Sequence, residues 1–159
     1  MKELEIYIDG ASKGNPGPSG IGVVICHCGC VIKNVSAYIG NATNNVAEYT
    51  ALIYALKEAM GLKADYLIVK TDSQLLARQL NKVYKVRNAN ISGLYNQSLG
   101  LLGLFKKFSI HSIPREENKG ADKLATLAVN RFFRKNEQAE CGCSPGKPAG
   151  GKSGLQRKA

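Results

Sequence analysis

The sequence predicts one α/β domain built on a five-stranded mixed sheet, in which three antiparallel strands are followed by two parallel strands and helices flank the sheet. Three observations predict this fold. Apolar and polar residues alternate over residues 4–8, which is the two-residue period of a strand. Residues 20–26 and 30–39 are further apolar segments with short connections, which favours an antiparallel meander. Strand-like runs at 66–71 and 108–113 each follow a helical pattern.

The first half of the chain contains the meander and one helix. Asp9 stands where the first alternation stops, and the glycines and prolines of residues 10–18 predict a loop. Residues 27–29 form a tight turn between the second and third strands. A helix is expected at residues 46–60, opened by residues 43–45 and stopped by Gly61.

The second half alternates strands and helices. Residues 66–71 are nearly all apolar, which indicates a strand buried on both faces. We expect helices at 74–80, 91–107 and 121–133, with a basic connector at 82–88 and a loop at 115–120. Residues 1–134 thus form the folded domain. Residues 135–159 are rich in Gly, Lys and Pro and predict a basic, disordered tail.

Length, composition and charge restrict the class of protein. The 159 residues, 44% of them hydrophobic, suffice for one domain with a core. No apolar run approaches the roughly 20 residues of a membrane span and no signal peptide opens the chain, so we expect a cytoplasmic protein without membrane association. The net charge of +10 favours a polyanionic partner, with a solubilising surface as the alternative.

Five cysteines lie in two groups, at positions 26, 28 and 30 and at positions 141 and 143. An odd count without a secretion signal argues against a disulfide framework. The Cys-x-Cys spacing fits zinc poorly, although His27 adds one potential ligand. We therefore expect small, reduced residues of a hairpin and of the tail, with a metal or redox sensor as the alternative.

Four acidic residues occupy comparable places in the predicted fold. Asp9 and Asp72 end apolar strands, while Glu48 and Asp122 lie in the first turn of a helix that follows the sheet. Each has a structural explanation: an Asp-Gly turn, a helix N-cap, a capping box with Asn45, and stabilisation of a helix dipole. In α/β sheets, however, strand ends and the following helix starts share one edge, where ligands bind.

Convergence of these acids on one crevice has a chemical consequence. Four carboxylates within a few ångströms repel one another unless cations lie between them. Oxygen ligands of this number suit Mg²⁺ or Mn²⁺. An acidic site in a basic protein indicates phosphodiester chemistry, in which two cations about 4 Å apart activate water and stabilise the leaving oxygen.

These residues resemble those of type 1 ribonuclease H over residues 3–131. The resemblance rests on four motifs, which are YIDGASKGNPGP at 7–18, ATNNVAE at 42–48, TDSQ at 71–74 and PREENKGAD at 114–122. It implies the RNase H-like fold and a metal-dependent endonuclease that cleaves the RNA strand of RNA–DNA hybrids, leaving 5′-phosphate and 3′-hydroxyl ends. It also implies two Mg²⁺ ions, or Mn²⁺ as substitute, a monomeric protein, and no small-molecule cofactor.

The resemblance assigns roles by position. Asp9 would bridge both ions, Asp122 would complete the site of the water nucleophile, and Glu48 with Asp72 would hold the second ion. Substrate contacts would come from a larger set: Gly10, Ser12 and Asn15 toward the RNA, Thr43 toward a DNA phosphate, and Asn44, Asn45 and Gln74 in the minor groove. Glu48 would also sense a 2′-hydroxyl. A hybrid is recognised by its shape and 2′-hydroxyls, so little sequence preference is expected.

Two departures from the family pattern concern the substrate. Many relatives carry, on the loop before the last acid, a histidine proposed to assist product release, whereas this loop has Arg115, Glu116 and Glu117 but no histidine. Either Arg115 takes over this assistance or the assistance is lost. The basic handle between the two middle helices is missing, so Lys85 and Arg87, with Lys82 and Tyr84, remain for the DNA strand.

Other functions of the same fold stay open at this point. Proofreading-type exonucleases have a second acid two residues after the first, where this chain has Ala11. Integrases, resolvases and a binding module with a lapsed site are further alternatives, although the intact set of four acids argues against the last.

Overall fold

The computed structural model describes the backbone of residues 1–140 and the side chains of residues 1–135. It divides into two compact units, Met1–Val129 and a second that begins at Asn130 and contains the end of the last helix. The predicted tail begins inside this helix, which continues to Glu140, and its remainder, residues 141–159, lies outside the described residues.

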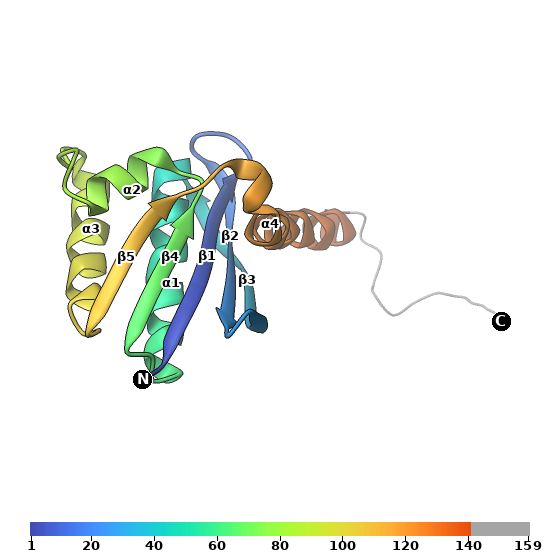
Figure 1. Cartoon of the computed structure of the whole chain (residues 1–159). Coiled ribbons are helices and arrows are strands. Elements are labelled where there is room, and N and C mark those ends of the chain that lie inside the picture. The colour runs from blue at the N-terminus through green and yellow to red at the C-terminus, as the bar shows by residue number, and fades with distance from the viewer. Residues whose placement is uncertain (141–159) are drawn as a thin grey trace. The chain divides into compact units, whose positions relative to one another are not determined.

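The five-stranded mixed sheet is confirmed, with the strand order β3-β2-β1-β4-β5 (Figure 1). The first three strands are antiparallel neighbours, and β4 and β5 are parallel to β1. The strands are β1 (Glu3–Ser12), β2 (Gly17–His27), β3 (Cys30–Ala42), β4 (Tyr66–Thr71) and β5 (Lys107–Ser112).

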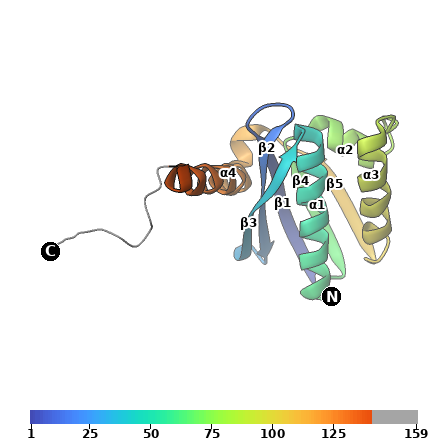
Figure 2. The same cartoon turned by 180° about the vertical axis from the view of Figure 1, so that it is seen from behind.

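In the part of the chain that the structure describes, four α-helices and one 3₁₀ helix connect and flank these strands. They are α1 (Asn44–Gly61), α2 (Gln74–Leu80), α3 (Ala89–Leu102), η1 (Arg115–Glu117) and α4 (Lys119–Glu140). Seen from behind, α1 runs along the sheet and α3 lies beside it (Figure 2). Among the described residues, no helix is both long and apolar enough to cross a bilayer.

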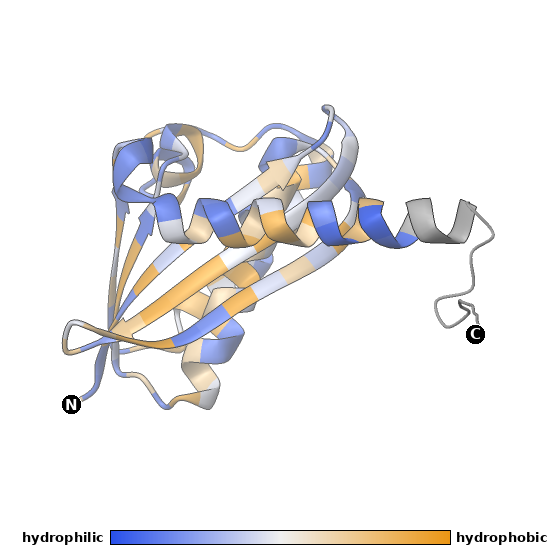
Figure 3. Cartoon of the chain, turned by 90° about the vertical axis from the view of Figure 1, so that its right-hand side faces the viewer, coloured by the Kyte–Doolittle hydropathy of each residue, from blue (hydrophilic) through white to orange (hydrophobic). Residues whose placement is uncertain are grey.

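The core lies between the sheet and α1. Leu4, Ile6 and Ile8 of β1 are fully buried, as are Leu52 and Leu56 of α1. The strands accordingly carry long hydrophobic stretches in Figure 3. Burial of this apolar surface is the main term that stabilises the unit.

Several predicted boundaries and one burial pattern were wrong. The strands predicted at 20–26 and 30–39 are longer, because β2 already begins at Gly17 and β3 continues to Ala42. The helix predicted at 91–107 ends at Leu102, because Gly103 caps it and β5 begins at Lys107. The last helix begins earlier and ends later than 121–133, since the residues after Phe133 favour helix. Strand β4 is not buried on both faces: its buried residues alternate with half-buried ones.

Candidate active site

Asp9 lies inside β1 and is only 5% exposed. The sequence predicted that this strand ends at Asp9, but β1 continues to Ser12. Gly10 and Ala11 still pair with β2, and the chain turns only after them. The last pair between β1 and β4 joins Ile8 to Thr71. Asp9 is therefore next to Asp72, the residue that follows β4.

Glu48 reaches the same place from α1. The helix begins at Asn44 and its N-cap is Thr43, whose hydroxyl accepts the Val46 N–H at 3.2 Å. Glu48 thus lies in the second turn, so its predicted place in the first turn was wrong. The alternative explanation, a capping box with Asn45, is excluded because Thr43 is the N-cap. A different bond fixes its side chain, since Oε1 accepts the Gly10 N–H at 3.0 Å.

Gly10 allows this approach of helix and strand. A Cβ atom built on it would lie 2.6 Å from the backbone carbon of Ala47 and 2.7 Å from the Glu48 nitrogen. Real Cβ contacts are longer, so a side chain here would push α1 away from β1. The absence of a side chain brings the Glu48 carboxylate beside Asp9.

Asp72 and Asp122 come from the other two segments. Asp72 follows β4 directly and is half-buried, while Ser73 is the N-cap of α2 and accepts the Leu76 N–H at 3.2 Å. The N-cap alternative for Asp72 is therefore excluded. Asp122 lies in the first turn of α4, as predicted, with Oδ1 3.6 Å from Nη2 of Arg115.

Asn118 ties the start of α4 to the sheet. It is 1% exposed, and its Nδ2 donates to the Ile8 carbonyl at 2.9 Å, next to Asp9. The backbone carbonyl of Asn118 accepts the Asp122 N–H at 3.1 Å. One side chain thus holds Asp122 at a fixed place relative to β1, a role that the sequence alone did not reveal.

Three of the four acids form a tight group. Carboxylate oxygens of Asp9, Glu48 and Asp72 lie within 4.8 Å of one another. Asp122 is outside this triplet but lines the same pocket of about 330 Å³. Of the predicted substrate contacts, this pocket is also lined by Gly10, Ser12, Asn44 and Arg115.

Burial and mutual repulsion govern the electrostatics of the group. Burial raises the pKa of Asp9 far above its ordinary value, and the negative charge of Glu48 adds to this. Burial likewise raises the pKa of Glu48. Within the described chain, Oε2 of Glu48 is buried and has no hydrogen-bond partner. A divalent cation would satisfy this oxygen and offset the repulsion.

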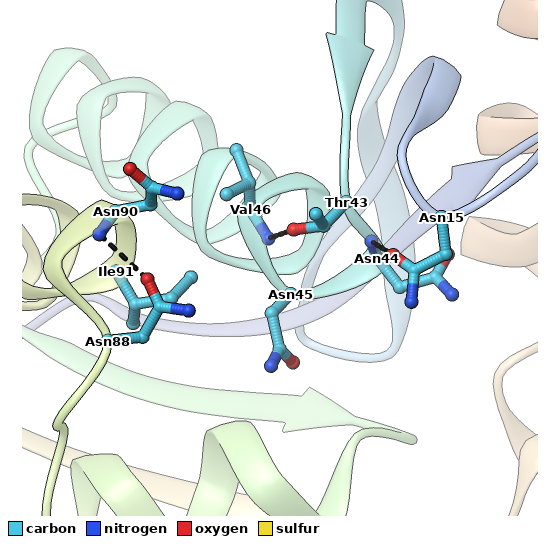
Figure 4. A pocket seen from close by; sticks show the side chains of 8 residues that line it. All are labelled: Asn15, Thr43, Asn44, Asn45, Val46, Asn88, Asn90 and Ile91. Carbon is cyan, nitrogen blue, oxygen red and sulfur yellow. Dashed lines mark hydrogen bonds between the residues drawn. The ribbon is translucent and has the colours of Figure 1, made fainter.

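A second pocket, of about 340 Å³, adjoins the first through Asn44 (Figure 4). Asn15, Thr43 and Asn45 line it as well, together with residues that the sequence did not single out: Asn88, Asn90, Val46 and Ile91. Both α1 and α3 have their N-terminus at this second pocket. Gln74, Lys85 and Arg87 are exposed and line neither pocket.

Known proteins share this fold and sequence. A family model described as Reverse transcriptase-like matches residues 7–128. Ribonuclease HI of Halobacterium salinarum is 38% identical over 128 residues, which cover 80% of this chain and 64% of that protein. The crystal structure of RNase H1 from this archaeon has a TM-score of 0.80 at 37% identity, with 81% of this chain and 98% of that chain covered.

Two further relatives extend the comparison. The structure of LC11-RNase H1 in complex with RNA/DNA hybrid has a TM-score of 0.78 at 38% identity and covers 82% and 99% of the two chains. The bifunctional protein Rv2228c of Mycobacterium tuberculosis is 39% identical over 130 residues, which are 80% of this chain but only 36% of that protein. On these matches, the chain belongs to the reverse transcriptase-like family and, within it, to the type 1 ribonuclease H family.

Proposed function

We propose that the domain is a metal-dependent endonuclease that hydrolyses the RNA strand of RNA–DNA hybrids by a two-metal-ion reaction and leaves 5′-phosphate and 3′-hydroxyl ends. The observation that carries this proposal is the carboxylate triplet of Asp9, Glu48 and Asp72 within 4.8 Å, in a chain of this family. The name of the halobacterial relative and the hybrid bound to LC11-RNase H1 support the substrate.

The residues present fit divalent cations. Mg²⁺ binds oxygen at about 2.0–2.1 Å, so two ligands of one ion lie about 3–4 Å apart. A group within 4.8 Å needs only small side-chain movements to reach that spacing. The unpartnered, buried Oε2 of Glu48 is the oxygen that such an ion would use.

The four acids would together bind two divalent cations, Mg²⁺ or Mn²⁺. When bound, the ions would activate a water molecule and stabilise the leaving oxygen. Asp9, centrally placed on β1, would bridge both. Glu48 and Asp72 would hold one ion with it, and Asp122 the other. Arg115, 3.6 Å from Asp122, would neutralise that carboxylate between turnovers.

The second pocket would bind a phosphate of the DNA strand. Three of its side chains have an acceptor oxygen already used by a backbone N–H: Asn15 by Asn44 at 3.1 Å, Thr43 by Val46 at 3.2 Å, and Asn88 by Asn90 at 2.7 Å. Among these three side chains, the amide NH₂ groups of Asn15 and Asn88 and the hydroxyl hydrogen of Thr43 thus remain as donors (Figure 4). Donors at two helix N-termini favour an anion.

Other contacts to the hybrid remain predictions. Gly10 and Ser12 at the acidic pocket would face the RNA, Asn45 and Gln74 the minor groove, and Lys85 with Arg87 the DNA backbone. We also predict a monomer that acts in the cytoplasm without a small-molecule cofactor, which gel filtration and cell fractionation can test. Because the chain spans 36% of the mycobacterial relative, these proposals concern this domain.

A cleavage assay tests the proposed function. Labelled RNA–DNA hybrid, RNA duplex and DNA duplex are incubated with the protein in Mg²⁺, Mn²⁺ or EDTA. We expect cutting confined to the RNA of the hybrid and abolished by EDTA. Asp9→Asn should lower kcat at least about 1,000-fold, while Glu58→Gln, on the same helix as Glu48, should leave it unchanged. An Asp9→Asn variant that still cuts would overturn the site, and binding without cutting would indicate a binding module.

The phosphate pocket has a separate test. Asn88→Asp keeps the oxygen that caps α3 but replaces the amide donor by a negative charge. We expect KM for the hybrid to rise about tenfold with kcat nearly unchanged. Asn90→Asp is the matched control for charge in the same pocket, because the backbone of Asn90, not its side chain, makes the capping bond. Equal effects of both would show that charge alone matters and not the donor of Asn88.

A further inference from the structure

The tip of the β2–β3 hairpin gathers one histidine and two exposed thiols. His27 ends β2, Cys30 begins β3, and these two residues pair directly across the strands. Cys28 and Gly29 form the two-residue turn, with φ values of 52° and 80°. Positive φ at both positions is the type I′ hairpin turn, which favours Asn, Asp or Gly. A cysteine in the left-handed region is therefore not explained by the preferences of the turn.

The imidazole of His27 is oriented by the backbone. Its Nδ1 is 3.0 Å from the carbonyl oxygen of Glu3, and a carbonyl can only accept, so Nδ1 carries the hydrogen. In the neutral ring the lone pair then lies on Nε2, which is 3.7 Å from Sγ of Cys28. Histidines that bind metals commonly donate their other ring nitrogen to a carbonyl in this way.

We propose that this tip binds a thiophilic d¹⁰ metal ion, Zn²⁺ or Cu⁺, through Nε2 of His27 and the sulfurs of Cys28 and Cys30. With Zn–S near 2.3 Å and Zn–N near 2.0–2.1 Å, a tetrahedral ion separates these two ligand atoms by about 3.5 Å. The observed separation of 3.7 Å is close to that value. Thiolate and imidazole ligands are those that select Zn²⁺ and Cu⁺.

Cys30 would turn to complete the site. Side chains paired across two strands have Cβ atoms about 4.5–5.5 Å apart, and Cys30 is exposed, so a rotation about χ1 can bring its sulfur toward Nε2. Among the described residues only the acidic triplet already has three ligand atoms within 4.8 Å. The third bond of the hairpin site thus forms on binding, and a water molecule can complete four-coordination of Zn²⁺.

Cys26 lies outside the proposed ligand set. It pairs with Glu5 and Val31 one residue before His27, so its side chain points to the other face of the sheet. The sequence predicted that the Cys-x-Cys spacing fits zinc poorly and named His27 as one potential ligand; in the hairpin, this histidine lies beside Cys28.

The hairpin site is independent of the proposed nuclease site. Glu3 and Asp9 are six residues apart on β1, which places the two sites about 20 Å apart at opposite ends of the strand. The hairpin is also closed without a metal ion, by its turn and by the buried Ile21, Val23 and Ile25 of β2. We therefore expect metal binding at the hairpin to leave the fold intact. This expectation does not depend on whether the domain has nuclease activity.

Spectroscopic titration of the full chain tests the proposal. The protein carries Cys141→Ser and Cys143→Ser, so that the only remaining thiols are those at positions 26, 28 and 30. Co²⁺ is added under reducing, anaerobic conditions, and absorption from thiolate-to-metal charge transfer reports sulfur ligands alone. We expect about one ion per chain, displaced by Zn²⁺, and a parallel titration with Cu⁺ and a competing chelator ranks the two metals.

Single substitutions then test the ligands. His27→Ala, Cys28→Ser and Cys30→Ser should each weaken the affinity for the better-bound metal at least about tenfold, whereas the matched control Cys26→Ser should change it less than about twofold. Circular dichroism and thermal unfolding verify that each variant is folded. Absence of a charge-transfer band together with absence of Cu⁺ binding would overturn the proposal, as would an equal loss of affinity in Cys26→Ser.

Discussion

The substitution Glu48→Gln isolates the electrostatic cost of the acidic site. Glutamine has the same shape, and its Oε1 can still accept the Gly10 N–H, which Glu48 accepts at 3.0 Å. Its Nε2 replaces the buried Oε2 that has no hydrogen-bond partner in the described chain, and it can donate to Asp9. The change therefore removes one buried charge and adds one donor without altering the packing.

The pKa of Glu48 gives the magnitude and its pH dependence. Burial raises this pKa from 4.5 to about 7 in the folded, metal-free protein. As pH rises past 4.5 the unfolded chain loses its proton first, so the wild type loses stability until pH has passed about 7. At 1.36 kcal/mol per pKa unit, the deficit is about 3 kcal/mol. We expect Glu48→Gln to be more stable than wild type by about this amount at pH 8 and equally stable at pH 4.

Urea unfolding in EDTA at pH 4 and pH 8 measures this difference. Addition of Mg²⁺ at pH 8 should stabilise the wild type, by about 2.7 kcal/mol at one hundred times Kd, and the variant much less. Glu58→Gln is the control on the same helix, because Glu58 forms a partly exposed ion pair with Lys33 and should change stability by less than about 1 kcal/mol. A metal-free Glu48→Gln no more stable than wild type at pH 8 would refute the reasoning.

Three other substitutions test the packing of the domain and of the site. In Gly22→Ala the added Cβ would lie 2.0 Å from the Ala121 carbonyl oxygen, so we expect the free energy of unfolding to fall by more than about 3 kcal/mol. Gly100→Ala in α3 meets no atom within 4 Å and should raise that free energy by about 1 kcal/mol. Both are measured by urea unfolding. Asn118→Ala should cost about 1–3 kcal/mol and lower kcat more than it raises KM, since it frees the start of α4 and with it Asp122. A rise in KM with kcat unchanged would instead assign Asn118 to substrate binding.

Local signals predicted much of the fold. The bounds of β4 and α2 agree with the prediction to the residue, because an apolar run, Asp72 and Ser73 delimit both. The end of β1 was misplaced because its last residues are held by pairing with β2, which is a long-range interaction. The length of α4 was underestimated, although Glu and Ala after residue 136 favour helix and could have indicated it.

The site was predictable in its residues but not in its geometry. Parallel strands and helix starts place Asp9, Glu48, Asp72 and Asp122 at one edge, and all four line one pocket. The sequence could not show that Gly10 must lack a side chain for Glu48 to approach, because that distance depends on how α1 packs. Asn118 was likewise missed, because its hydrogen bond joins segments far apart in the chain. Asn88 was missed because the start of α3 was predicted two residues too late.

The phosphate pocket illustrates the same limit. Thr43 and Asn15 were assigned to the substrate by resemblance, whereas Asn88 enters only because α3 begins beside α1. The signal for it was present as an asparagine just before a helix, a common N-cap. What the sequence did not contain was the meeting of two helix N-termini at one place, on which the proposed preference of the pocket for an anion rests.

Location of Mn²⁺ in crystals tests the central claim most directly. Crystals of the Asp122→Asn variant with a bound RNA–DNA hybrid and Mn²⁺, and of the wild type with Mn²⁺ alone, would be examined by anomalous diffraction. We predict an ion among Asp9, Glu48 and Asp72 in both, with Oε2 of Glu48 or a water bound to it among the ligands. Anomalous density elsewhere, with these three carboxylates still clustered and no ion between them, would contradict the account.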